Sequence, residues 1–151
     1  MPTRLLIIIL IGVILTVSFI FFTKREKQYT KVKLGNIEIR AELAETPAKR
    51  TKGLMFRKKL GKENGMLFIF PNESKHSFWM LNTFVPLDII WIDSDKNVVH
   101  VERSVPPCTE SIKSACKSYK PSEKARYVLE VSAGVFEKSN ANVGEKVLFE
   151  L

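Results

Sequence analysis

The sequence predicts a mainly β fold, a jelly-roll-like sandwich or barrel of about seven or eight strands with two short helices, preceded by one N-terminal transmembrane helix. Three observations lead to this fold class. Beyond residue 30, short apolar runs are separated by turn residues. Several of these runs alternate apolar and polar residues, which is typical of half-buried strands. The run 5–22 is different, because it is predominantly apolar and carries no charge.

Residues 5–22 predict a single membrane span. At 1.5 Å of rise per residue, a helix of this run is about 27 Å long, which suffices to cross the hydrocarbon layer with little tilt. Bulky residues at 19–22 occupy the place where a signal peptidase site would need small ones. We therefore expect residues 1–23 to be a membrane anchor or uncleaved signal, residues 24–30 a linker, and residues 31–151 the soluble domain.

The first part of the domain predicts a hairpin followed by a short helix. Residues 31–34 and 37–43 are strand candidates separated by a Gly-Asn turn pair at 35–36. Thr46 can cap a helix over residues 47–52, which has proline in its first turn and glycine after its end. Both predictions follow from local turn and capping chemistry.

The rest of the domain is dominated by strand candidates. They are residues 66–70, 77–81, 87–92, 98–103, 127–133 and 146–151. Residues 94–97 are a turn candidate, and residues 104–125 form a long loop rich in proline, serine and lysine. Residues 133–140 predict a second short helix.

Cys108 and Cys116 lie in that long loop and predict a disulfide. The bridge would stabilise the domain by roughly 2.5 kcal/mol through loop closure. Free thiols are the alternative, and the spacing fits no standard zinc site, so we expect no metal and no cofactor. A disulfide is typical of an oxidising compartment.

Two features of the sequence give opposite predictions for the side of the membrane on which the domain lies. Basic residues are denser after the span than before it, and this favours a cytosolic domain. The cysteine pair favours the other side of the membrane. We expect a single-pass membrane protein whose soluble domain is extracytoplasmic.

Residues 49–62 carry seven basic side chains and no acidic one, within a chain of net charge +8. Such a run could bind anionic lipid head groups or a polyanion. A solvated face is the more common reading, because the run lacks the interleaved exposed aromatic residues that grip single-stranded nucleic acid. We expect no nucleic-acid partner.

Four segments carry a family resemblance: TPAKRTKGLMFRKKL (46–60), GMLFIF (65–70), FWMLNTFVPLDIIWID (78–93) and YVLEVSAG (127–134). Together with a later VGEKV, they resemble the domain of unknown function 192 family over roughly residues 37–149. The resemblance implies a compact, β-rich, jelly-roll-like domain with short helices, often preceded by a signal or anchor. It implies no established activity, and no catalytic residues can be carried over from it.

The candidate site is a polar group within the apolar stretch 76–93. Asn82, Thr83 and Asp88 lie inside this stretch, and a buried carboxylate is costly unless it is paired. In a purely structural interpretation, Asp88 accepts hydrogen bonds from N–H groups of the 82–86 loop or from the Thr83 hydroxyl.

In a ligand-binding interpretation, the same loop forms the floor of a binding site. Aromatic faces together with polar groups suit a sugar or another small polar ligand. The candidate binding residues are His76, Trp79, Asn82, Thr83, Asp88 and Tyr119. We expect a non-enzymatic domain that binds a small polar ligand, an envelope component or a protein partner through the 82–88 face, although each tryptophan alone is more simply explained as core.

Two rival functions are open on the sequence. One is an envelope-associated hydrolase with Asp88 as acid or base, which would need a second carboxylate such as Glu130 or Glu102 within reach. The other is a structural or assembly module in which the basic residues 49–62 and the tether do the work.

Overall fold

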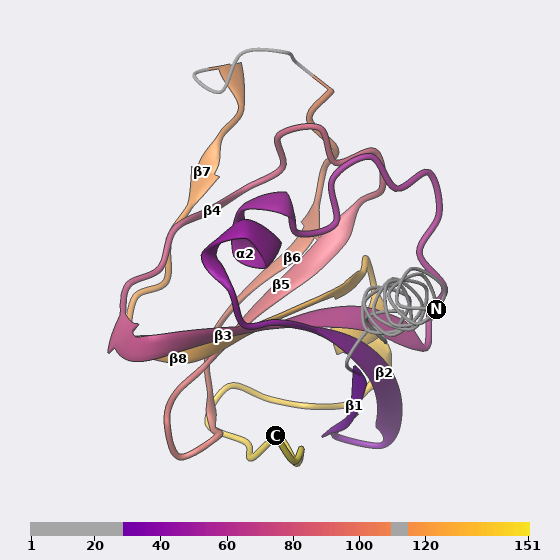
Figure 1. Cartoon of the computed structure of the whole chain (residues 1–151). Helices are drawn as coiled ribbons and strands as arrows, with labels where there is room; N and C mark the ends of the chain where they lie inside the picture. Colours follow the sequence, from indigo (N-terminus) through magenta and orange to yellow (C-terminus); the bar gives the residue numbers. More distant parts are fainter. Residues whose placement is uncertain (1–28, 110–114) are drawn as a thin grey trace, which may run out of the picture.

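The computed structural model describes residues 29–109 and 115–151, which form a mainly β domain (Figure 1). The expected anchor at 1–23 and nearly all of the expected linker lie outside these residues. Within the described ranges, no helix has the length and apolar character needed to cross a membrane.

A six-stranded sheet in the order β1-β2-β3-β8-β5-β6 organises the domain. Its strands are β1 (Tyr29–Leu34), β2 (Ile37–Ala44), β3 (Asn64–Ser74), β5 (Leu87–Ile92), β6 (Val98–Val105) and β8 (Ala125–Ser132). Neighbours are antiparallel except β2 and β3, which are parallel because helix α2 (Pro47–Lys52) crosses between them. A small second sheet pairs β4 (Phe78–Trp79) with β7 (Ser118–Tyr119).

The capping chemistry expected for the helix at 47–52 is present. The Thr46 hydroxyl accepts a hydrogen bond from the Lys49 N–H at 3.2 Å, and proline occupies the first turn. Gly53 ends the helix with φ of 47°, a conformation that glycine adopts without penalty. α2 therefore begins and ends as the sequence predicts, and it is placed over one face of the large sheet.

Each face of the large sheet is covered, so the domain has two apolar layers. On one face, here called the α3 face, Leu129 and Val131 of β8 pack with Phe136 of helix α3 (Val135–Lys138) and with the C-terminal segment. On the opposite face, here called the α2 face, Trp91 and Val128 pack under α2 and the small sheet. Figure 1 shows α2 and the β4–β7 ribbon on the same side of the sheet.

The mainly β class is confirmed, whereas a closed barrel is not: β1 and β6 are the two edges of the large sheet. The terminal strand predicted at 146–151 is also wrong. This segment forms two isolated bridges, Lys33 with Leu148 and Asn97 with Lys146, so it spans two different partners instead of extending along one. The predicted strand at 77–81 shortens to β4, and β7 forms inside the predicted long loop.

Candidate functional site

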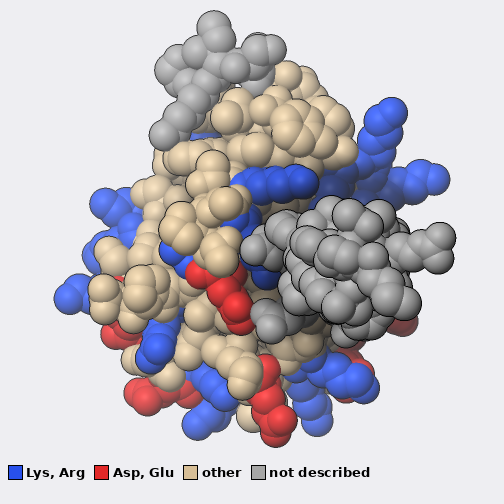
Figure 2. Space-filling model, viewed as in Figure 1, with Lys and Arg blue, Asp and Glu red and all other residues tan. Residues whose placement is uncertain are grey.

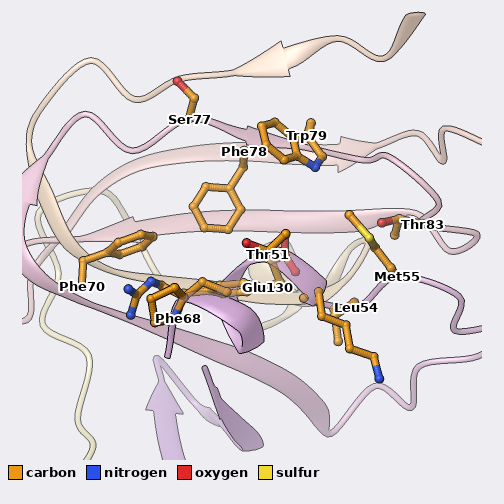
Figure 3. Close-up of a pocket in the computed structure, with 14 residues that line it drawn as sticks. Thr51, Leu54, Met55, Phe68, Phe70, Ser77, Phe78, Trp79, Thr83 and Glu130 are labelled. Carbon is orange, nitrogen blue, oxygen red and sulfur yellow. The ribbon is translucent and has the colours of Figure 1, made fainter. Parts of the chain in front are cut away.

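A pocket of about 290 Å³ lies between α2, β3 and the small sheet, and we call it the α2 pocket (Figure 3). Leu54 and Met55 form one apolar wall, and Phe68 and Phe78 form another. Polar side chains also line it: Arg50, Thr51 and Lys52 on α2, Ser77 before β4, Thr83 on the loop after β4, and Glu130 on β8. Figure 3 shows these side chains arranged around a common space. An apolar cavity with a few polar groups is the usual form of a small-molecule site.

Glu130 is the buried acid of this pocket. It lies in the middle of β8, directly paired with Met66 of β3 and Ile89 of β5, and it is only 4% exposed. Its carboxyl group forms no hydrogen bond with any described residue. Burial raises the pKa of Glu130 to about 8, against the opposing attraction of the Arg57 guanidinium. The group is therefore mainly protonated at neutral pH and can donate a hydrogen bond.

Two of the six residues predicted to bind ligand, Trp79 and Thr83, line the α2 pocket. His76 is nearby and stacks on Phe70, another lining residue, with ring centroids 3.6 Å apart. Burial lowers the pKa of His76, so this ring is neutral at pH 7, and its Nε2–H donates to the Asn72 carbonyl at 3.1 Å. The structure thus brings part of the predicted set together on the α2 face.

The remaining predicted residues lie beside the pocket or away from it. Tyr119 is buried in β7, paired with Phe78. Asn82 has φ of 52°, and its carbonyl accepts the Phe56 N–H at 2.8 Å. Neither side chain is part of the pocket lining. Both residues instead support the segments that carry Phe78 and Thr83.

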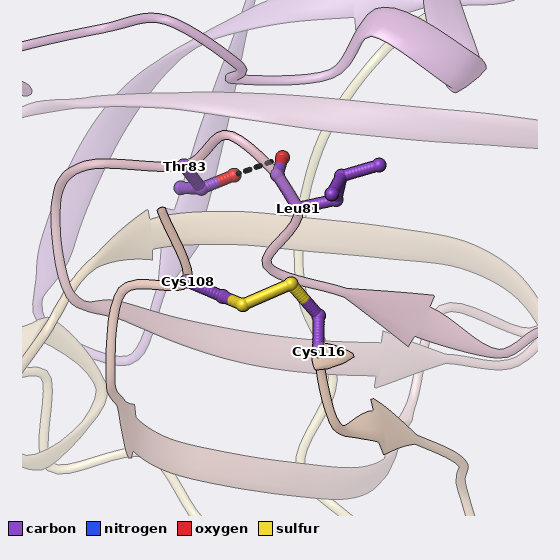
Figure 4. The surroundings of a disulfide bond; sticks show 4 residues. All are labelled: Leu81, Thr83, Cys108 and Cys116. Atoms are coloured by element: carbon purple, nitrogen blue, oxygen red, sulfur yellow. Dashed lines mark hydrogen bonds between the residues drawn. A yellow bond between two sulfur atoms is a disulfide. The ribbon is translucent and has the colours of Figure 1, made fainter. Parts of the chain in front are cut away.

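Asp88 lies on the opposite side of the sheet from the α2 pocket. It is completely buried on the α3 face, where its carboxylate accepts the Ser104 N–H at 2.8 Å and the Phe136 N–H at 2.9 Å. The structural interpretation of a carboxylate that accepts backbone N–H groups is therefore correct in kind. Its expected partners in the 82–86 loop are wrong, because alternation along β5 turns Asp88 away from that loop. The Thr83 hydroxyl instead donates to the Leu81 carbonyl at 3.4 Å (Figure 4).

A disulfide joins Cys108 to Cys116, with Cα atoms 5.9 Å apart, as the sequence predicts (Figure 4). The Cys108 N–H donates to the Thr83 carbonyl at 3.2 Å, so one end of the bridge is attached to the pocket wall. Cys116 shortly precedes β7, which pairs with β4 and so with Phe78. The disulfide therefore connects two segments that hold the outer wall of the α2 pocket.

A second pocket of about 200 Å³ adjoins the first and is here called the basic pocket. It is lined by Glu42, Lys49, Lys52 and Arg57, and it shares Lys52 with the α2 pocket. Arg57 donates two hydrogen bonds to the Glu42 carboxylate, at 2.6 and 2.9 Å, and these bonds raise the pKa of Arg57. The α2 pocket is thus bordered by a positively charged neighbour.

Comparison with known proteins identifies the family. The model of DUF192, described as "Uncharacterized ACR", matches residues 30–149. The chain belongs to the DUF192 family. The match spans both pockets, Asp88 and the disulfide, so all of the geometry above lies within the DUF192 domain.

Curated relatives of this DUF192 chain are named UPF0127 proteins. One from Thermococcus sibiricus is 30% identical over 117 residues, which cover 74% of this chain and 67% of that protein. One from Pyrococcus horikoshii is 32% identical over 110 residues, which cover 70% of this chain and 83% of the relative. The chain spans about two thirds of the length of the Thermococcus relatives.

Two solved structures share the fold of this DUF192 chain. A chain from Sinorhizobium meliloti, described as a "putative transcription regulator", has a TM-score of 0.73 and 28% identity, over 82% of this chain and 95% of that one. A protein of unknown function from Novosphingobium aromaticivorans has a TM-score of 0.69 and 33% identity, over 80% of this chain and 83% of that one. The fold is therefore shared with both of these solved proteins.

Proposed function

We propose that this DUF192 domain binds a compact small molecule in the α2 pocket, with Glu130 as the hydrogen-bonding group at its floor. The observation that carries the proposal is a buried carboxyl group that has no hydrogen-bond partner among the described residues and lines an open cavity. An unpaired buried polar group costs about 1–3 kcal/mol. The Glu130 carboxyl group faces the cavity, so a ligand can supply a hydrogen-bond partner there in a poorly hydrated setting, where such a bond is stronger than in water.

The chemistry of the pocket narrows the ligand class. A neutral carboxyl group donates a hydrogen bond, so the ligand presents a carbonyl, ether or hydroxyl oxygen to Glu130. The apolar body of the ligand packs against Phe68, Phe78 and Trp79. Thr83 adds a hydroxyl from the 82–88 loop, so a small polar ligand with an apolar face, such as a sugar, fits the site.

The setting of the domain is part of the proposal. The uncharged run at 5–22 supports a membrane tether, and the Cys108–Cys116 disulfide supports a location outside the cytosol. Components of the cell envelope are therefore the first ligands to test.

The geometry supports binding over the rival hydrolase. Glu130 is the only acidic residue in the described lining of the α2 pocket. Asp88, which the hydrolase hypothesis pairs with it, is on the α3 face and has both carboxylate oxygens engaged by backbone N–H groups. A hydrolase that uses two carboxyl groups needs both groups beside the substrate bond that is cleaved. Asp88 and Glu130 are on opposite faces of the sheet and do not meet this requirement.

The test is a screen of neutral sugars, amides and envelope fragments by ligand-detected NMR against the full chain in detergent. Each hit is then measured against Glu130→Leu, Glu130→Gln and the surface control Glu63→Gln. We expect Glu130→Leu to lose binding and Glu63→Gln to keep it. Glu130→Gln keeps an N–H donor at neutral charge, so it should bind at neutral pH and still bind above pH 8, where the wild type weakens.

Hits whose affinity is the same in wild type and Glu130→Leu would contradict the proposal. So would wild-type binding that is unchanged from pH 6 to pH 9, because the site would then not involve the titrating carboxyl group.

A further inference from the structure

The basic residues at 49–62 lie on α2 and on the loop that leads to β3. Two of them are engaged: Arg57 pairs with Glu42, and Arg50 donates to the Glu45 and Ile69 carbonyls. The other five form no ion pair with a described residue, and they are Lys49, Lys52, Lys58, Lys59 and Lys62. Figure 2 shows blue side chains standing out from the surface at the upper right, on the side of the domain where Figure 1 shows the loop after α2. This edge of the domain is an uncompensated cationic surface.

Two exposed aromatic rings lie on the same edge, and one of them, Phe56, is inside residues 49–62, so the expectation that this run lacks an exposed aromatic residue is wrong. Phe56 is 61% exposed and Phe84 is 38% exposed, and their ring centroids are 6.3 Å apart. Phe56 has φ of 64°, a strained conformation for a bulky residue, and its N–H is held by the Asn82 carbonyl at 2.8 Å. The backbone thus holds a large apolar ring in water, where the described part of the domain leaves most of it uncovered.

The aromatic pair stands at the rim of the α2 pocket. Met55 and Thr83, the chain neighbours of Phe56 and Phe84, both line the pocket. Lysines that flank exposed aromatic rings are typical of surfaces that enter the headgroup region of a bilayer.

The chain enters the domain at this edge. Tyr29, the first residue of β1, pairs with Glu42 of β2, and Glu42 lines the basic pocket together with Lys49 and Lys52. Only residues 23–28 separate Tyr29 from the apolar run 5–22. Fully extended, six residues reach about 20 Å. With the apolar run in a bilayer, the cationic edge lies close to the lipid headgroups.

We propose that Lys52, Phe56, Lys58, Lys59 and Phe84 form a docking face that rests on a bilayer containing anionic lipid. The lysines meet lipid phosphates, and the two rings lie at headgroup depth. The rim of the α2 pocket then faces the headgroup region. The docking face depends on the tether at 5–22 and is independent of what the α2 pocket binds.

The test places the full chain in nanodiscs of phosphatidylcholine alone or of phosphatidylcholine with phosphatidylglycerol. Amide hydrogen exchange is followed by mass spectrometry. In the anionic nanodiscs, we expect several-fold slower exchange over residues 53–62 and 80–86, and unchanged exchange at the turn 94–97. Added salt should remove the difference, because exposed charges are screened.

Charge reversal provides the matched variants. Lys58→Glu with Lys59→Glu should abolish the slower exchange in anionic nanodiscs. Lys75→Glu with Lys124→Glu changes the same number of charges at the opposite end of β3, where Ser74 pairs with Ala125, and should retain it.

Three outcomes would overturn the docking face. They are equal exchange in the two kinds of nanodisc, slower exchange that survives the Lys58 and Lys59 reversal, and failure of the full chain to insert into either nanodisc. Ligand binding at Glu130 is measured separately in detergent, so the two proposals can fail independently.

Discussion

Asp88 and Glu130 lie on neighbouring strands and project from opposite faces of the same sheet. Asp88 of β5 pairs directly with Val131 of β8, and Glu130 is the next residue back along β8. One carboxylate is saturated by two backbone N–H groups, whereas the other has no hydrogen-bond partner among the described residues and lines a cavity. The buried carboxylate therefore serves structure on the α3 face, whereas on the α2 face the carboxyl group is open to a cavity, where we propose that it binds a ligand.

Replacement of Asp88 by alanine should destabilise the domain strongly. Asp88 ties Ser104 of β6 and Phe136 of α3 to β5, and its loss leaves the buried Phe136 N–H without an acceptor. Hydrogen bonds to charged groups are worth more than neutral ones, so we expect a loss of about 3 kcal/mol in the free energy of unfolding. Urea unfolding measures it, with the exposed turn residue Asp95 changed to alanine as control. If Asp88→Ala were as stable as the wild type, neither hydrogen bond would contribute to the free energy of unfolding.

Glu130 should make the stability of the domain depend on pH. Its folded pKa is raised to about 8, above the ordinary value of 4.5, so the folded state holds the proton more tightly than the unfolded state. This contribution is fully present below about pH 4.5 and is lost as the pH rises to about 8. The urea midpoint of the wild type should therefore fall between pH 5 and pH 8 relative to Glu130→Gln, which does not titrate.

The control for that measurement is Glu63→Gln, an exposed carboxylate that should follow the wild-type curve. Parallel curves for wild type and Glu130→Gln across the whole range would mean that the folded and unfolded pKa values of Glu130 are alike.

The elements that the sequence predicts best are those specified by local chemistry. The hairpin of β1 and β2 turns at Gly35, which has φ of 53°, and α2 is bounded by Thr46 and Gly53. The end of the chain is different. Val147 and Phe149 are buried and Leu148 is exposed, so the alternation of residues 146–151 reports burial correctly. That alternation does not say whether a sheet partner runs alongside.

The site is only partly visible in the sequence for a similar reason. Thr83 belongs to an unusual polar interruption of the apolar stretch 76–93, Trp79 is an aromatic residue of that stretch, and both line the α2 pocket. Glu130 occurs in YVLEVSA, where alternation suggests a half-buried strand with Glu130 in water. Its burial depends on β8 lying between β3 and β5 with α2 above, which is long-range information.

Loss of the disulfide should weaken both stability and ligand binding. Replacing Cys108 and Cys116 by serine removes a short loop closure worth roughly 2.5 kcal/mol. It also loosens Thr83, whose carbonyl accepts the Cys108 N–H. We expect a lower urea midpoint and weaker binding of any hit from the Glu130 screen, while Thr109→Ala, at an exposed residue next to Cys108, leaves both unchanged. If the double variant bound its ligand with wild-type affinity, the disulfide would not contribute to the shape of the α2 pocket.

The compartment of the domain can be read from the same cysteines. An extracytoplasmic, oxidised pair should react with a membrane-impermeant maleimide on intact cells only after reduction, as scored by the mass of each cysteine peptide. If the cysteines were labelled only after lysis, and without any reductant, the domain would be in the cytosol and the two cysteines would be reduced there.

Phe56→Gly should leave the domain at least as stable as the wild type while weakening its attachment to anionic lipid. Glycine adopts the observed φ of 64° without penalty, and the ring it removes is 61% exposed, so little buried apolar surface is lost. We expect a gain of up to about 1 kcal/mol in urea unfolding. Exchange over residues 53–62 in anionic nanodiscs should become faster. Phe68→Gly is the contrasting variant, because that ring is buried in the wall of the α2 pocket and its loss should destabilise the domain by about 3–5 kcal/mol. A marked loss of stability in Phe56→Gly would mean that its ring packs against the domain in solution and is not held ready for the bilayer.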